Sequence, residues 1–456
     1  MSKTNIKLLT HGNILKTLIL FALPFLFSSI LQAGYGLADM LIISYFASEA
    51  DLAGVTNGAQ IAWTLIFLAS GLTMGGTILI GQFFGARDLK NVQETISTMF
   101  VLFFWVSICL IVPVLFFIDP IMHILKIPTE AFQQGKDYVL VSTIGILFTF
   151  GYNGICAILR GLGDSKNPLY FILIASIINV ILDIIFIKYL HMGAFGAGLA
   201  TILAQGISFL IAIFYLKKKK FAFELSFSHK KFKKDKALLL FKVGVPLSLQ
   251  DTFLMLSFLI GMISLNKLGL IVSAASGIAE KIDGLTFLPA LAIGSAISAM
   301  VAQNVGARRI KRAKQVMFTG FLLSLVFAIP SFILVHFFPQ WVMNLSSNNP
   351  AIIQAGADYL FSYSSSVLMI TIVFSLNAFL NGCGATTFTM VNNSFANLCV
   401  RIPLLLLATD VMAVGFTSPL TIYSQITFAL LYFYSGYWKK AIIKQNLKTK
   451  KSLKNT

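Results

Sequence analysis

Two aspartates stand inside long apolar stretches of the sequence, where a buried charge is costly and usually marks an ion or proton pathway. Asp39 lies towards the end of the first apolar run, and Asp183 lies within the fifth. Asn179 precedes Asp183 by one helical turn and so shares its face, while Asn153 falls at mid-depth of the fourth run. Carboxylate and amide oxygens bind hard cations, and two neighbouring buried carboxylates also bind a proton. These four residues predict an ion-coupling site. Two coupling ions stay open for it: Na⁺, held by Asp39 and Asp183, and a proton.

The second half of the sequence carries a different set of polar residues inside its apolar runs. Glu280 and Asp283 flank Lys281, which could neutralise either of them in an ion pair or contact a substrate. Arg401 lies close before Pro403 and needs a partner or a water-filled cavity. We expect substrate contacts across both lobes, and the cavity lining is expected to include seven residues of this half: Gln250, Asp251, Glu280, Lys281, Asp283, Asn377 and Arg401.

The composition of the chain determines where these residues must lie. Of the 456 residues, 57% are hydrophobic and 11% are charged, and the mean hydropathy is +0.84. Soluble domains carry about 25% charged residues, so this chain is expected in a membrane, which excludes a cytosolic enzyme, a secreted disulfide scaffold and a disordered regulator. The sequence contains no G-x-x-x-x-G-K-[ST], H-E-x-x-H or G-x-S-x-G motif. We therefore expect no enzyme activity, no cofactor and no ATPase partner, and we interpret the four cysteines as packing residues.

Apolar runs of spanning length predict an all-α integral membrane protein with twelve transmembrane helices, because a spanning helix needs about 20 apolar residues. The first six are expected at 15–45, 53–82, 95–118, 138–158, 168–189 and 194–216. The second six are expected at 238–266, 270–303, 315–338, 352–380, 388–410 and 415–438. The predicted organisation is a first lobe at 1–216, a basic linker at 217–237, a second lobe at 238–440 and a basic tail at 441–456.

The basic residues orient these helices. With both termini in the cytoplasm, 29 of the 35 Lys and Arg residues fall on the cytoplasmic side, as the positive-inside rule requires. Four lysines fall in outer loops: Lys126, Lys136, Lys188 and Lys267. This distribution explains the net charge of +18 without nucleic acid as a partner. We expect a multi-pass protein of the cytoplasmic (inner) membrane whose basic linker also contacts anionic lipids.

The sequence repeats itself at a spacing of about 221 residues, which indicates an internal duplication. Gly-Gln-Phe-Phe-Gly-Ala-Arg at 81–87 recurs as Ala-Gln-Asn-Val-Gly-Ala-Arg at 302–308. Arg-Gly-Leu-Gly at 160–163 recurs as Asn-Gly-Cys-Gly at 381–384, and the pair Asp-Tyr recurs at 137–138 and 358–359. Six helices per half make this a parallel repeat, in which a substrate site is expected near the midplane between the lobes.

Several of these motifs resemble those of the multidrug and toxic compound extrusion (MATE) family, over roughly residues 10–440. Leu23-Pro24, and Asp39 followed by Met-Leu-Ile-Ile, resemble its first helix; the repeated Gly-Ala-Arg segments and the loop at 159–164 are also similar. The resemblance implies an antiporter that expels amphipathic, mostly cationic compounds in exchange for Na⁺ or H⁺. In the DNA-damage-inducible-type branch, the implied coupling residues match Asp39, Asn153, Asn179 and Asp183.

Another branch of the family carries acidic residues where this sequence has Leu254 and Asn377, so a second-lobe ion site of that kind is not implied. Two alternatives to drug efflux stay open: a lipid-linked precursor flippase of the same superfamily, and an exporter of one specific metabolite. The expected partners are small amphipathic cations and the lipid bilayer, and the chain is expected to act as a monomer.

Overall fold

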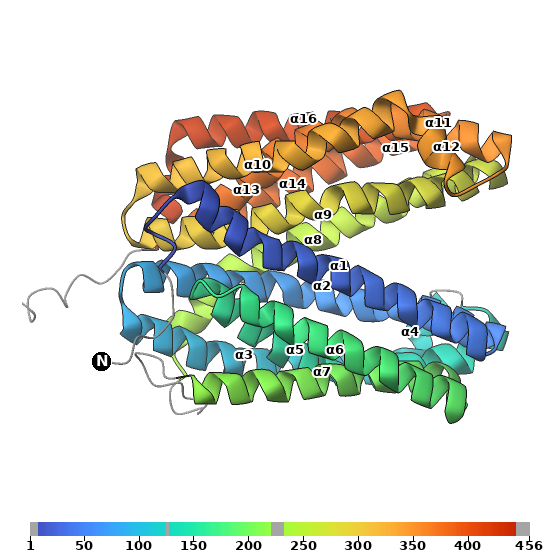
Figure 1. The fold of residues 1–456 in the computed structure, drawn as a ribbon, viewed down its shortest axis with the longest axis horizontal. Coiled ribbons are helices and arrows are strands. Elements are labelled where there is room, and N and C mark those ends of the chain that lie inside the picture. The colour runs from blue at the N-terminus through green and yellow to red at the C-terminus, as the bar shows by residue number, and fades with distance from the viewer. Residues whose placement is uncertain (1–7, 125–126, 220–231, 444–456) are drawn as a thin grey trace, which may run out of the picture.

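Helices make up most of the protein in a computed structural model that describes residues 8–124, 127–219 and 232–443 (Figure 1). The described part of the first half contains α1 (Ile14–Phe46), α2 (Glu49–Gly85), α3 (Leu89–Phe116), α4 (Ile118–Ile124), a 3₁₀ turn (Thr129–Ala131), α5 (Phe132–Gly161), α6 (Lys166–Asp183), a π-helical turn (Ile184–Tyr189) and α7 (Gly193–Lys218). The second half contains α8 (Lys234–Lys267), α9 (Leu270–Gly306), α10 (Ile310–Phe337), α11 (Pro339–Asn344), α12 (Pro350–Tyr363), α13 (Ser365–Cys383), α14 (Thr386–Phe395), a π-helical turn (Ala396–Arg401), α15 (Ile402–Leu407), α16 (Val411–Ser435) and a 3₁₀ turn (Tyr437–Ala441). The described ranges contain no strand, so the predicted all-α class is confirmed.

The predicted membrane spans are confirmed as a set. Among the described residues, 11 helical segments are long and apolar enough to cross a membrane. The twelfth is α16, which has the length but carries Thr, Ser and Gln side chains along its course. Large apolar side chains such as Phe116 and Leu270 are 80% and 86% exposed, as expected for surfaces that face lipid. The chain is therefore a multi-pass membrane protein.

Some helix boundaries differ from those expected. The span expected at 352–380 is divided at Ser364, whose hydroxyl donates to the carbonyl of Phe361 (2.6 Å) and contacts the His336 ring (2.8 Å). Such local bonding competes with the regular helical ladder. The second span begins at Glu49 rather than 53, because Ser48 and Asp51 form a capping box. The span expected at 388–410 contains the π-helical turn Ala396–Arg401.

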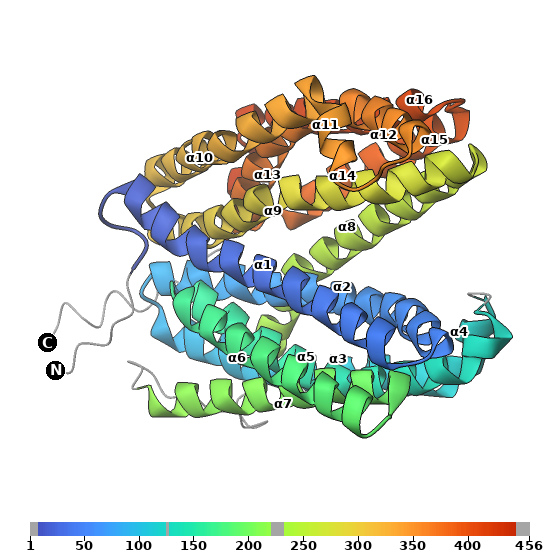
Figure 2. The ribbon, with the colours of Figure 1, turned by 45° about the vertical axis from the view of Figure 1, so that its right-hand side comes forward.

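The helices form two lobes, α2–α7 and α9–α16, joined by the two long helices α1 and α8 (Figures 1 and 2). The first part of α1 packs into the second lobe, where Leu18 and Phe21 share a core with Ile297, and its later part runs along α6. The reciprocal arrangement holds for α8, whose early residue Leu240 shares a core with Leu72 of α2 while its later part contacts α14. Each of the two long helices, α1 and α8, therefore packs against both lobes.

The expected lobe limits stay a prediction, since parts of the linker and tail (220–231 and 444–456) and Lys126 lie outside the described residues. Figure 2 shows that the two lobes meet where α2 and α9 end and diverge towards the opposite side of the molecule. At the meeting point the backbones of α2 and α9 touch. A Cβ added to Gly85 would lie 2.0 Å from the carbonyl oxygen of Gln303, and one added to Gly306 would lie 1.9 Å from that of Gln82. Glycine is therefore required at both positions of the repeated motif.

Two glutamines of the same repeated motif bind across this meeting point. Gln82 Nε2 donates to the carbonyl of Gly382 (2.8 Å), and Gln303 Nε2 donates to the carbonyl of Gly161 (2.9 Å). Their side-chain oxygens accept backbone N–H groups from near the chain ends, from Ile443 to Gln82 (3.3 Å) and from Leu9 to Gln303 (2.8 Å). The near-symmetric pairs close this end of the molecule.

Candidate functional site

The carboxyl groups of Asp39 and Asp183 come together in the first lobe. Asp39 lies in the later part of α1, which packs along α6, and Asp183 is the last residue of α6 before the π-helical turn Ile184–Tyr189. The two carboxyls lie within hydrogen-bonding range of each other, and Asp183 has no exposed surface. Such π-helical turns often occur at functional sites because they shift the side chains that follow onto a new face.

Several oxygen atoms around this pair have no hydrogen-bond donor among the described residues. They are Asp39 Oδ1, both carboxyl oxygens of Asp183, and Asn179 Oδ1, and all four are buried. The amide nitrogen of Asn179 donates to Thr201 Oγ1 at 3.5 Å. Two adjacent buried carboxylates cannot both stay charged without a proton or a cation between them. The arrangement can therefore take up one proton or a monovalent cation.

Two tyrosines that the sequence interpretation missed also adjoin this site. Tyr35 lies one turn before Asp39 on α1, and Tyr138 of α5 interacts electrostatically with both Asp39 and Asp183. A signal for Tyr138 was present in the sequence, since the Asp-Tyr pair at 137–138 recurs at 358–359. It indicated only duplication, because nothing in the sequence placed Tyr138 opposite the carboxylates.

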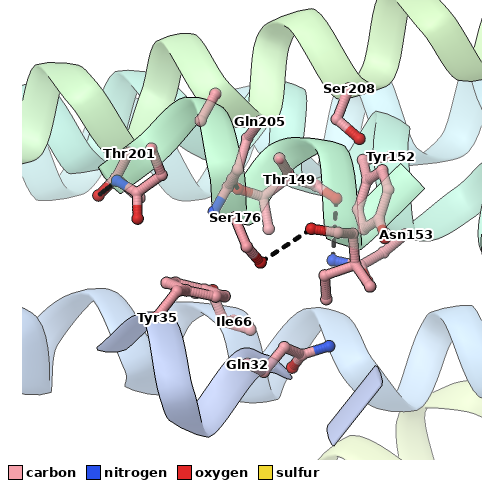
Figure 3. A pocket seen from close by; sticks show the side chains of 14 residues that line it. Gln32, Tyr35, Ile66, Thr149, Tyr152, Asn153, Ser176, Thr201, Gln205 and Ser208 are labelled. Carbon is pink, nitrogen blue, oxygen red and sulfur yellow. Dashed lines mark hydrogen bonds between the residues drawn. The ribbon is translucent and has the colours of Figure 1, made fainter. Parts of the chain in front are cut away.

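A pocket of about 110 Å³ with a largely apolar lining opens beside the carboxylate pair. Figure 3 shows Gln32 and Tyr35 of α1 facing Asn153 and Ser176 across it. Its lining comprises Gln32, Tyr35, Ile66, Thr149, Tyr152, Asn153, Ile172, Ala175, Ser176, Asn179, Thr201, Ala204, Gln205 and Ser208. This mixture of apolar and neutral polar groups is typical of small-molecule sites.

The pocket and the carboxylate pair are adjacent but distinct. Tyr35 and Asn179 line the pocket and stand one helical turn from Asp39 and Asp183, respectively. Asn153 belongs to the pocket side, where its Nδ2 donates to the carbonyl of Thr149 (2.9 Å). In the part of the chain that the structure describes, no hydrogen bond joins Asn153 to either aspartate.

The seven residues of the second half that are expected to line the substrate cavity lie on several helices. Asp251 of α8 accepts a hydrogen bond from Ser70 Oγ of α2 at 2.9 Å, across the contact between the lobes. The neighbouring Gln250 has a buried Oε1 that accepts no bond within the described ranges. Asn377 lies in α13, where its Nδ2 donates to Asn393 Oδ1 at 3.4 Å.

The sequence left open whether Lys281 pairs with Glu280 or Asp283, and the structure places Arg401 near these carboxyl groups. Glu280 and Asp283 of α9 lie within electrostatic range of Arg401, which is 8% exposed. Lys281 is exposed, and over the described ranges no ion pair within 4.0 Å joins it to either carboxylate. Lys281 stands between them in sequence but on another face of the helix, so the buried basic group beside the carboxylates is Arg401.

Comparison with known proteins gives consistent results. The MatE family model matches residues 24–185 and 246–407, once in each half of the chain. A probable multidrug resistance protein of Bacillus subtilis, YpnP, is 29% identical over 94% of this chain and 97% of its own length. An FAD transporter of Shewanella oneidensis is 24% identical over 80% of this chain and 82% of its own length. A crystal structure of MATE in the straight conformation superposes with a TM-score of 0.85 at 20% identity, covering all of both chains.

Proposed function

The chain belongs to the MatE family of membrane transporters, and from that premise we propose that it is a secondary active antiporter that exports amphipathic, mostly cationic compounds in exchange for Na⁺ or H⁺. Its relatives include probable multidrug resistance proteins, and the chain is a transporter and not an enzyme. The proposal concerns the coupling ion, the residues that bind it and the class of compound exported.

The group of buried acceptor oxygens at Asp39, Asp183 and Asn179 carries this proposal. These oxygens lack donors among the described residues, and two of the side chains are carboxylates in hydrogen-bonding range of each other. Binding a proton or Na⁺ there removes repulsion between the carboxylates, so the site favours occupancy. Tyr35 and Asn179 link it to the neighbouring pocket, so ion binding can alter the shape of the pocket and the affinity for a substrate.

The divergence of the two lobes supports alternating access. The lobes are closed where α2 and α9 end, and the basic residues that follow these two helices assign this end to the cytoplasm under the positive-inside rule. We propose that this conformation opens outward. An ion that enters from outside reaches Asp39 and Asp183 in this state, and the substrate leaves.

The test is dye efflux from proteoliposomes loaded with the cationic dye rhodamine 123, with Na⁺ and proton gradients imposed separately. We expect one of the two gradients to drive efflux and its collapse to stop it. Asp183→Asn should abolish this coupled efflux. The matched control is Asp119→Asn, because Asp119 is half exposed and pairs with Lys136 (2.6 Å). Full coupled efflux by folded Asp183→Asn protein would refute the assignment of the ion site.

One observation favours a second candidate, export of a single metabolite: one relative is an FAD transporter. Competition separates the two readings. A multidrug exporter should be inhibited by several unrelated cationic dyes, whereas a flavin exporter should be inhibited by FAD and by none of the dyes.

A further inference from the structure

The second lobe contains a cluster of charges that the coupling mechanism does not use, in which Arg401 is buried, Asp283 is half-buried and Glu280 is exposed. Glu280 and Asp283 stand one helical turn apart on α9, and Arg401 ends the π-helical turn between α14 and α15. Tyr359 and Tyr363 of α12 lie beside them with their rings stacked, 6.1 Å between centroids. Arg401 interacts electrostatically with all four of these side chains.

The opposite charges of this cluster are close but not in contact. Over the described residues, no ion pair within 4.0 Å joins Arg401 to Glu280 or Asp283. The Nε of Arg401 is buried and donates to none of the described residues, and Asp283 Oδ1 is buried and accepts from none. The guanidinium carbon lies 4.6 Å from the centre of the Phe258 ring. A buried guanidinium N–H without an acceptor is expensive, so the arrangement is typical of a site that a ligand completes.

The internal repeat places this cluster where the first lobe has its ion site. At the 221-residue spacing of the motifs at 160–163 and 381–384, the counterpart of Asn179 is Val400, and Arg401 is the next residue. Tyr359 is the counterpart of Tyr138 in the repeated Asp-Tyr pair. The first-lobe site holds two carboxylates and no base among the described residues, whereas the second-lobe cluster holds two carboxylates and a fixed cation. The two halves of the duplicated fold thus carry clusters of different charge in the same region of each lobe.

We propose that the second-lobe cluster is a binding site for an amphipathic zwitterion. A carboxylate of the ligand accepts hydrogen bonds from Arg401, an ammonium or amidinium group lies against Glu280 and Asp283, and an aromatic body packs on Phe258 and the two tyrosines. A simple cation is repelled by Arg401, and a simple anion is repelled by the two carboxylates, so a ligand with both charges fits best. This inference rests on the proposed export function and names the class of compound bound in the second lobe.

A pair of dyes that differ in one group tests the assignment. Rhodamine 110 carries a free carboxylate, and rhodamine 123 is its methyl ester. Binding of each to the purified full-length protein in detergent is measured by fluorescence polarisation. The wild-type protein should bind rhodamine 110 at least as tightly as rhodamine 123. Arg401→Gln should weaken rhodamine 110 binding about tenfold or more, because a hydrogen bond to a charged group is lost, and should change rhodamine 123 binding less than about twofold. Arg401→Lys should restore part of the preference.

The outcomes are distinct. If Arg401→Gln weakens the binding of both dyes equally, Arg401 only supports the fold. If Arg401→Gln leaves rhodamine 110 binding unchanged, the dye binds elsewhere. Either result overturns the proposal. If Arg401→Gln does not fold, the wild-type comparison still decides: tenfold tighter binding of the ester than of the acid refutes a zwitterion site. Coupled efflux of rhodamine 123 in the same preparation shows that the proposed export function stands even where this inference fails.

Discussion

The contact between α2 and α9 predicts how a single methyl group would shift the transporter between its states. In Gly306→Ala, the new Cβ would lie 1.9 Å from the carbonyl oxygen of Gln82, whereas ordinary contact begins at 3.4 Å. The helices must therefore separate by about 1.5 Å at this point, since neither backbone can yield locally. The hydrogen bond from Gln82 to Gly382, now 2.8 Å, would then be broken.

The size of the effect follows from these two losses. Overpacking costs about 1–3 kcal/mol, and a lost hydrogen bond costs about 1 kcal/mol, so the closed state should lose about 2–4 kcal/mol. The opposite conformation, in which α2 and α9 part, does not carry this cost. The ratio of the two states should therefore change by a factor of about 30 to 1,000 towards the state that is open at this end.

Spin-label distances between the lobes measure this shift. Lys90 and Lys311 are exposed, follow α2 and α9 respectively, and occupy equivalent positions of the repeat. With the four native cysteines replaced and both lysines changed to labelled cysteine, we expect one dominant short distance in the parent protein and a longer one in Gly306→Ala. Gly206→Ala is the matched control, because its Cβ would lie 3.8 Å from the Phe148 ring, an ordinary contact. An unchanged distance distribution in folded Gly306→Ala protein would refute the role of this contact.

Further predictions concern the contact between the two lobes and the ion site and pocket of the first lobe. Gln303→Ala should lower the free energy of unfolding by about 1–3 kcal/mol in thermal melts, because Leu9 loses its acceptor and Gly161 its donor. Tyr138→Phe should raise the concentration of coupling ion needed for half-maximal efflux about threefold or more while leaving the protein folded; an unchanged ion requirement would exclude the hydroxyl from the site. Asn179→Ala should likewise raise the concentration of coupling ion needed for half-maximal efflux. Asn153→Ala should instead raise the dye concentration needed for half-saturation. The reverse pattern would contradict the division between ion site and pocket.

The sequence was sufficient for the features that depend on local pattern. Spans follow from apolar runs, and the duplication follows from motifs such as the Gly-Ala-Arg segments, so the helical class and the repeat could be predicted. Asp39 and Asp183 could be expected to share a site because charged groups in an apolar run must find each other or water. The structure brings them within hydrogen-bonding range.

Features that depend on packing between distant helices were not predictable. The passage of α1 into the second lobe depends on how α1 packs against α9, which no local pattern encodes. The pocket residues Thr149 and Gln205, whose side chains are joined by a short hydrogen bond, are single polar residues in apolar helices. Which face each helix turns inward decided their role. For the same reason, Arg401 and not the adjacent Lys281 proved to be the base beside Asp283.

The exchange of an ion for a substrate at Asp39 and Asp183 is the central claim, and reciprocal flux tests it most directly. An outward gradient of rhodamine 123 across sealed proteoliposomes, with no ion gradient imposed, should drive uptake of the coupling ion, followed as ²²Na⁺ entry or as internal acidification. This uptake should vanish in Asp183→Asn and persist in Asp119→Asn. Dye efflux without uptake of either ion, or ion uptake that survives Asp183→Asn in folded protein, would contradict the account.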